Sequence, residues 1–67
     1  MAEKYRYRGR WAEQMGHPAG SWAYFYAYSD KDALVEFRRL TGLSRNNGDQ
    51  IEIQSWDEDF HFWMDID

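Results

Sequence analysis

Two stretches near the start of the chain alternate strictly between two kinds of side chain. Residues 4–11 place Lys and Arg on one parity and mostly aromatic residues on the other, and residues 21–28 set Trp and Tyr against Ala and Phe. A period of two is typical of β-strands with one face in the core. Residues 15–20, with two Gly and one Pro, interrupt the pattern and predict a loop. We therefore expect a long-looped antiparallel hairpin.

A helix is predicted over residues 30–41, where the period becomes that of an amphipathic helix. Ser29 is placed to accept a hydrogen bond from the backbone N–H of Asp32, as in an N-terminal capping box. Gly42 supplies the left-handed residue that commonly follows a helix. The expected apolar stripe consists of Ala33, Leu34, Phe37 and Leu40.

The last third of the chain contains two more predicted strands. Residues 51–54 and 60–67 alternate, the acidic residues 57–59 between them predict a tight turn, and the Asn-Gly pair within 45–49 predicts another. Residues 1–67 are thus expected to form a single small α+β domain. Its order is β-β-α-β-β, with a four-stranded antiparallel sheet and one helix packed on one face.

One helix covers only one face of such a sheet, and the parity of each strand assigns side chains to the two faces. The expected helix-facing core comprises Tyr5, Tyr7, Trp11, Ala23, Phe25, Ala27, Ile51, Ile53, Phe60, Phe62, Met64 and Ile66. The opposite face comprises Arg6, Arg8, Arg10, Trp22, Tyr24, Tyr26, Tyr28, Glu52, Gln54, Trp56, His61, Trp63, Asp65 and Asp67. Uncovered, it would carry more aromatic surface than a monomer usually exposes.

Composition agrees with a folded domain and argues against an enzyme. Of the 67 residues, 43% are hydrophobic and 19% aromatic, which is too many for a disordered chain. The absence of Cys excludes a disulfide framework and a thiolate metal site. The glycines form no phosphate-binding motif, and His61 lacks a second His nearby with which to bind a metal. His17 in the loop could meet a carboxylate, but no Ser has a nucleophile setting. We expect no catalytic residues, no metal and no cofactor.

Charge is distributed unevenly along the chain. The net charge is −4, yet residues 46–67 hold seven carboxylates and neither Lys nor Arg. Two interpretations are open. The acids can pair with the N-terminal arginines across the sheet, which is an ordinary stabilising device. Alternatively they can steer the approach of a basic partner.

The aromatic face and the acids together favour binding of a protein or nucleoprotein complex. Trp, Tyr and Arg are enriched at binding hot spots. The predicted partner-binding residues are Trp22, Tyr24, Tyr26, Trp56, Trp63, Asp57, Glu58, Asp59, Asp65 and Asp67. Two other interpretations stay open: the Arg side chains and rings cover one another by cation–π stacking, or two copies pack as a homodimer.

Direct nucleic-acid binding is the alternative from another class. Arg6, Arg8 and Arg10 interleaved with Tyr could hold phosphates while the rings stack bases. The acidic end of the chain would repel phosphate, however, and no RNP-type motif is present. We therefore expect this function less than protein binding.

In size, acidity and lack of Cys the chain resembles the anti-defence inhibitors of phages and mobile elements, which include anti-CRISPR proteins. The resemblance is one of general composition, includes no motif and transfers no residue role. It implies an inhibitor that occupies a basic channel of a nucleic-acid-handling complex. The chain shows no signal peptide and no apolar stretch long enough for a membrane span, so we expect a cytoplasmic protein without membrane contact.

Overall fold

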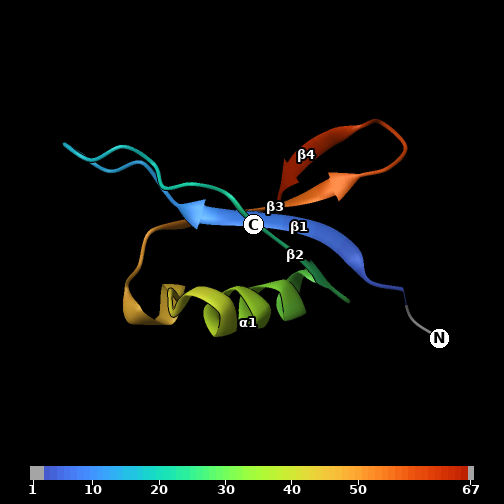
Figure 1. Ribbon diagram of the computed structural model, residues 1–67, viewed down its shortest axis with the longest axis horizontal. Helices are drawn as coiled ribbons and strands as arrows, with labels where there is room; N and C mark the ends of the chain where they lie inside the picture. Colours follow the sequence, from blue (N-terminus) through green and yellow to red (C-terminus); the bar gives the residue numbers. More distant parts are fainter. Residues whose placement is uncertain (1–2, 67) are drawn as a thin grey trace.

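The computed structural model describes residues 3–66 and contains a four-stranded antiparallel sheet with one helix beneath it (Figure 1). In chain order the elements are β1 (Tyr5–Trp11), β2 (Ala23–Ala27), α1 (Asp30–Thr41), the short 3-10 helix η1 (Arg45–Asn47), β3 (Ile51–Asp57) and β4 (Phe62–Asp65). The spatial order of the strands is β2-β1-β3-β4. The predicted α+β fold and its β-β-α-β-β order are confirmed.

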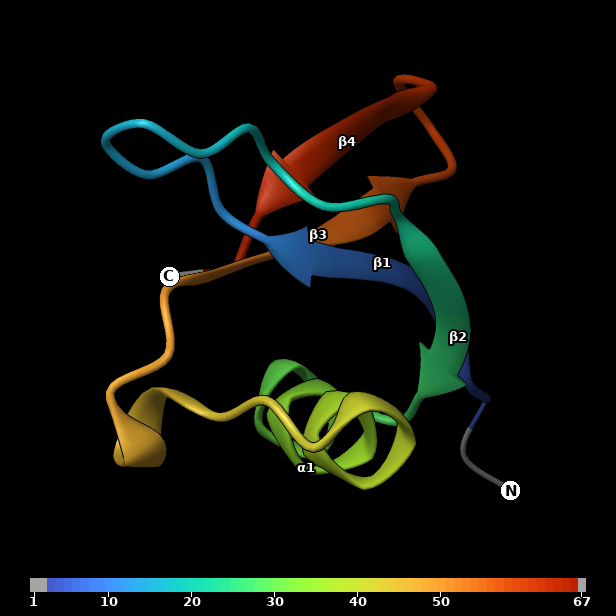
Figure 2. The ribbon, with the colours of Figure 1, turned by 60° about the vertical axis from the view of Figure 1, so that its left-hand side comes forward.

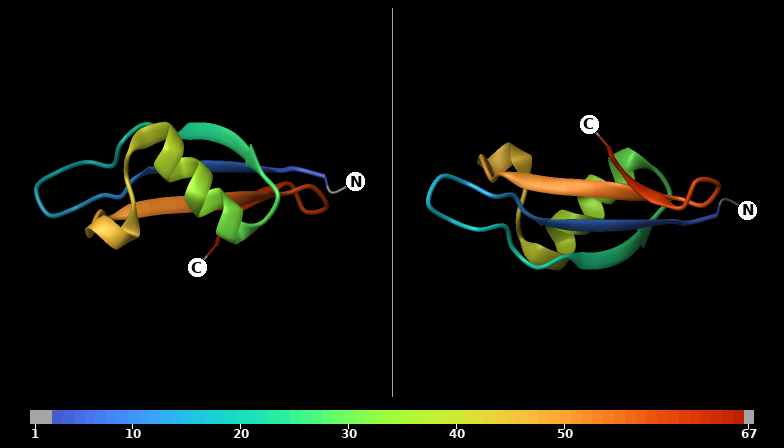
Figure 3. Two further views of the ribbon diagram at one scale, coloured as in Figure 1. Left: turned by 90° about the horizontal axis from the view of Figure 1, so that it is seen from below. Right: turned by 90° about the horizontal axis from the view of Figure 1, so that it is seen from above.

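The register of the strands divides the side chains between the two faces as predicted. Tyr7 lies opposite Phe25 on β2 and opposite Ser55 on β3. Arg8 lies opposite Tyr24 and Gln54 in the next row. Because directly paired residues project to the same side of a sheet, these two rows define a helix-facing side and an open side. Figure 3 shows α1 crossing the sheet when the molecule is seen from below.

The helix begins and ends at the residues expected. Ser29 Oγ accepts a hydrogen bond from the backbone N–H of Asp32 at 3.1 Å, and Asp32 Oδ2 accepts one from Tyr28 N–H at 3.0 Å. This reciprocal arrangement satisfies N–H groups that the helix itself cannot pair. Gly42 has a φ of 80° and donates its N–H to Arg38 O at 2.7 Å, which ends the helix.

A small core fills the space between α1 and the three strands β2, β1 and β3. Its buried residues are Tyr7, Phe25, Ala27, Ala33, Phe37, Ile51 and Ile53, and Leu34, Leu43 and Ile66 pack against them. The Phe25 ring lies 5.8 Å from that of Tyr7 and 6.1 Å from that of Phe37. Ala27 of β2 and Ala33 of α1 are fully buried, and α1 lies beneath the sheet (Figure 2).

The predicted core was too wide. Five of its members are about half exposed or more, namely Tyr5, Trp11, Phe60, Phe62 and Met64, and so is Leu40 of the predicted helix stripe. The physical reason is that α1 is too short to cover the whole helix-facing side of the sheet. Its twelve residues pack against β2 and β3, and no helix lies beneath β4 (Figure 2). Alternation assigns a side chain to a face but does not say whether another element covers that part of the face.

Strand boundaries also differ from those predicted. The third strand continues past Gln54 to Asp57, the second spans only Ala23–Ala27, and the fourth begins at Phe62. Asp57 therefore closes β3 instead of opening the turn. Its Oδ1 accepts hydrogen bonds from the backbone N–H groups of Asp59 and Phe60 at 2.9 and 3.0 Å. The four-residue connection ends at His61, which has a left-handed φ of 57°.

Tyr7 gives the fold a dependence on alkaline pH. Its buried hydroxyl donates to Asp30 Oδ1 at 2.9 Å, and burial together with that carboxylate raises the pKa of Tyr7 well above its usual range. The folded state therefore retains the phenolic proton at a pH where the unfolded chain has lost it. The stabilisation is complete below about pH 10, the tyrosine value in an unfolded chain, and falls as pH rises further.

We expect the urea midpoint of the wild type to fall between pH 9 and pH 11.5 more steeply than that of Tyr7→Phe, which has no proton to lose at this site. Tyr24→Phe, at an exposed position, should keep the wild-type slope. Equal slopes for all three proteins would contradict the assignment. The measurement is urea unfolding followed by far-UV circular dichroism across this pH range.

Candidate protein-binding face

Arg8 occupies the centre of the open side of the sheet, between two tryptophan rings. Its guanidinium carbon lies 4.1 Å from the ring centroid of Trp22 and 4.4 Å from that of Trp63. Its Nε donates to Gln54 Oε1 at 2.8 Å. Trp22 precedes β2 and Trp63 lies on β4, so the two rings come from distant parts of the chain. They meet over Arg8 because β1 lies between β2 and β3, and β3 pairs in turn with β4. Stacking of a planar guanidinium on indole rings is favourable on both faces.

Arg10 extends the same arrangement by one row. Its guanidinium lies 4.0 Å from the Trp22 centroid, and its Nη2 forms an ion pair with Glu52 Oε2 at 3.3 Å. Its Nε is buried without a hydrogen-bond partner among the described residues. The interpretation that Arg side chains and rings cover one another therefore applies to Arg8 and Arg10.

The tryptophans of β3 and β4 form a second cluster beside Arg8. The Trp56 and Trp63 centroids are 5.2 Å apart with tilted rings, and His61 stacks on Trp56 at 6.1 Å. Tyr24 reaches this cluster from the far side of β1, with its centroid 6.0 Å from that of Trp63. All three predicted tryptophans are half-buried, because they pack on their neighbours within the face.

The most exposed part of the open side lies along β2. Tyr24, Tyr26 and Tyr28 are 63%, 56% and 51% exposed. Arg6 lies directly opposite Tyr26 and makes no hydrogen bond, ion pair or ring contact with the residues that the structure describes. Lys4 lies 5.2 Å from the Tyr28 centroid. We call the exposed set Arg6, Tyr24, Tyr26 and Tyr28 the tyrosine row.

The structure places predicted acidic residues near both ends of β4 and not in one compact cluster. The Asp57 carboxylate accepts hydrogen bonds from backbone N–H groups of its own turn, whereas Glu58 and Asp59 are exposed at the tip of the β3–β4 hairpin. Asp65 lies at the other end of β4 and accepts a hydrogen bond from Gln54 Nε2 at 3.0 Å. Asp67 lies outside the described residues. The alternative prediction was that the acids pair with the N-terminal arginines across the sheet. Among the described residues, one ion pair of this kind is present, between Arg10 and Glu52.

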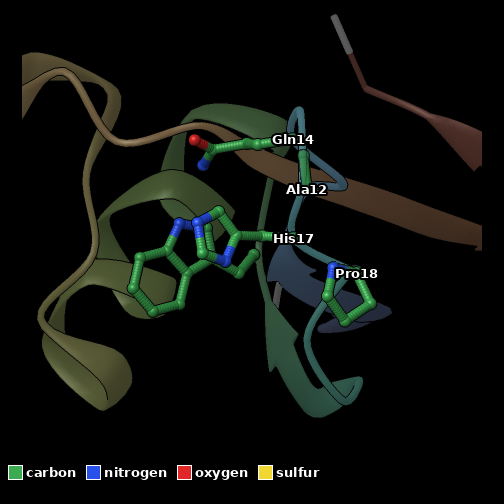
Figure 4. Close-up of a pocket in the computed structure, with 5 residues that line it drawn as sticks. Ala12, Gln14, His17 and Pro18 are labelled. Atoms are coloured by element: carbon green, nitrogen blue, oxygen red, sulfur yellow. The ribbon is translucent and has the colours of Figure 1, made fainter.

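Sequence reasoning missed two surfaces. The first is the exposed apolar set on the helix side of β4, which the alternating pattern assigned to the core. The second is a cleft of about 430 Å³ in the β1–β2 connection, lined by Trp11, Ala12, Gln14, His17 and Pro18 (Figure 4). Its lining includes no carboxylate that could pair with His17 for acid–base chemistry. The Gly and Pro of this loop predicted a turn but not the cleft.

Residues 3–66 contain no group of three or more His, Asp or Glu side chains arranged to hold a metal ion. In the same part of the chain, no helix has the length and apolarity needed to cross a membrane.

No protein-family model, no curated protein and no solved structure matches this chain. The class of molecule is accordingly defined by its own geometry: a small α+β protein with one helix-covered sheet face and one open, aromatic sheet face.

Arg8→Lys tests the stacking at the centre of the open side. A lysine keeps the charge but loses the planar group between the two indoles, so we expect a loss of about 1 kcal/mol in unfolding free energy and altered tryptophan fluorescence. Arg6→Lys is the matched control, because Arg6 makes no such contact with the described residues. Equal behaviour of the two variants in urea unfolding would show that the stack contributes nothing measurable.

Proposed function

We propose that the protein is a non-enzymatic binding protein that engages a partner protein through the tyrosine row and the adjoining Trp22 and Trp63. The observation that carries the proposal is that Tyr24 and Tyr26 on β2, and Tyr28 just after it, are more than half exposed. The helix α1 lies on the other side of the sheet (Figure 3). Side chains of this type, clustered and rigidly held, are those that dominate protein interfaces.

The support within the face is its pre-organisation. Arg8 and the tryptophans already contact one another in the free protein, so less side-chain ordering would be required when a partner binds. The tyrosines at the margin then supply exposed apolar area together with hydroxyl groups that can hydrogen-bond. A rigid centre with an exposed aromatic margin is well suited to stoichiometric protein binding.

Protein binding is favoured over nucleic-acid binding because two of the arginines on the open side already interact with neighbouring side chains. Arg8 and Arg10 are engaged with tryptophan rings and with Gln54 and Glu52, and Glu52 places a carboxylate on the same face. Phosphate contacts would have to compete with these interactions and with the nearby negative charge. Inhibition of a nucleic-acid-handling complex remains the particular form of protein binding that we propose for this chain, with Glu58 and Asp59 as its exposed acids.

Site-specific photo-crosslinking tests the proposal. A benzophenone side chain replaces Tyr26, on the open side, and in a matched variant replaces Leu40, which is 52% exposed on the helix. We expect a defined protein to be crosslinked from position 26 and not from position 40. Binding of that protein, purified, should weaken at least thirtyfold with Tyr24→Ala or Tyr26→Ala, while the unfolding midpoint stays close to that of the wild type.

Two results would contradict the proposal. Crosslinking that is equal from positions 26 and 40 would show that the open side is not selective. Labelled single-stranded RNA that binds at physiological salt and is released by Arg6→Glu would assign the face to nucleic acid instead. Sedimentation across a concentration series accompanies both experiments, because a tight dimer would show that the rings are used for self-association.

A further inference from the structure

Strand β4 lies at the edge of the sheet and pairs with β3 on one side only. Ile66 N–H donates to Ile53 O at 3.2 Å, and hydrogen-bonded pairs alternate along an antiparallel ladder. The backbone groups of Met64 therefore point toward β3, whereas those of Trp63 and Asp65 point away from the sheet. Such outward-facing N–H and C=O groups can pair with another extended strand.

On the helix side, the edge is flanked by apolar side chains. Phe62 and Met64 lie opposite Asp57 and Ser55, and are 46% and 44% exposed. Phe60, in the preceding turn, is 76% exposed and its ring lies 6.3 Å from that of Phe62. These side chains have no polar group that would favour contact with water, so covering them is favourable.

On the open side, the same edge is acidic. Asp65 projects there beside Trp63, and Glu58 and Asp59 are exposed at the turn that leads into β4. Arg8 is linked to Asp65 through Gln54, but it is one cation beside three carboxylates, those of Asp65, Glu58 and Asp59. The potential along β4 is therefore negative, which favours a basic partner and repels a second β4.

We propose that the free edge of β4 takes up an extended peptide of a partner protein as a fifth strand, and that this peptide alternates apolar residues with Lys or Arg. Its apolar side chains would cover Phe62 and Met64, and its basic side chains would lie beside Asp65 on the open side. A second copy of the chain fits less well, since its own edge strand β2, Ala23–Ala27, carries no cation. The inference concerns a different surface from the tyrosine row, and the two are tested by different variants.

A synthetic peptide of nine alternating Val and Arg residues, labelled with fluorescein, is the probe. We expect its fluorescence anisotropy to rise with added protein, and a Val/Glu peptide of equal length to bind at least tenfold more weakly. Two further peptides carry N-methyl groups on all Arg amides or on all Val amides. In an antiparallel fifth strand the Arg amides face β4, and in a parallel one the Val amides do. One methylated peptide should therefore lose binding at least tenfold while the other retains it.

Variants of Asp65 separate the backbone from the charge. Asp65→Ala keeps the outward N–H and should weaken binding a few-fold, whereas Asp65→Pro removes that donor and should weaken it at least tenfold. Proline is compatible with β4 here because the Asp65 N–H does not face β3. Tyr26→Ala, in the tyrosine row and without a contact to Trp63 among the described residues, should leave peptide binding unchanged, which distinguishes this edge from the tyrosine row.

Several results would overturn the inference. Equal binding of both methylated peptides would show that attraction is only electrostatic, and this measurement uses wild-type protein, so it holds even if Asp65→Pro fails to fold. Loss of peptide binding with Tyr26→Ala would move the site to the open side. A wild-type dimer that Asp65→Pro converts to a monomer would assign the edge to a second copy.

Discussion

Phe37→Ala is expected to leave the protein largely unfolded at 25 °C. Phe37 is 1% exposed and is the largest side chain that α1 contributes to the core. Removing a buried Phe ring costs about 3–5 kcal/mol, through lost apolar contact and the cavity that remains. The single core of a domain of this length rarely supplies more than about 3–5 kcal/mol of stability, so the substitution removes most of it.

Leu40→Ala is the matched control on the same helix. Leu40 was predicted to share the buried stripe, but it is 52% exposed, so we expect its truncation to cost less than about 1 kcal/mol. Urea unfolding followed by near-UV circular dichroism compares the two variants. A similar loss from both would show that the helix buries the wider stripe that its sequence predicts.

Gly9→Ala is expected to destabilise the protein by about 1–3 kcal/mol through overpacking. A Cβ at position 9 would lie 2.6 Å from both Cδ1 and Cε1 of Phe37, and Phe37 has no free space to retreat into because it is buried. In an unobstructed strand the same change would increase stability by about 0.5–1 kcal/mol, so the sign of the effect identifies the contact. Gly9 thus allows α1 to lie against β1.

A double-mutant cycle isolates that contact. Phe37→Leu removes ring atoms at the point of the clash, so Gly9→Ala should cost less in this background than in the wild type, by about 1 kcal/mol or more. The four proteins are compared by urea unfolding. Additive losses would mean that Gly9 is required for a reason other than the ring of Phe37.

Local pattern was sufficient to predict the elements and their faces. Period-two alternation placed Arg8 and Tyr24 on one side of the sheet and Tyr7 and Phe25 on the other, and the register confirms both rows. The helix ends followed from Ser29 and Gly42, because capping depends on residues within one turn. These features are encoded by neighbours in the sequence.

Features that depend on tertiary arrangement could not be read in this way. The stack of Trp22 and Trp63 on Arg8 requires the strand order, which periodicity does not contain. The exposure of Phe62 and Met64 depends on how far one helix extends across a twisted sheet. Asp57 was predicted as a partner contact, but its carboxylate is occupied by backbone N–H groups, a role visible only once the turn is formed.

The central position of β1 has a consequence for how the chain reaches this structure. The first strand of the sequence is completed on one side by the nearby β2, but on the other only by β3, whose residues 51–57 come near the end of the chain. During synthesis the β1–β2 hairpin and the helix are therefore made first. One side of β1 stays unpaired until β3 has been synthesised. The slow step of folding is expected to be the closure of this long-range pairing, as is usual where non-local strands meet. Before that step, the unpaired side of β1 is the part of the nascent chain most open to wrong pairing.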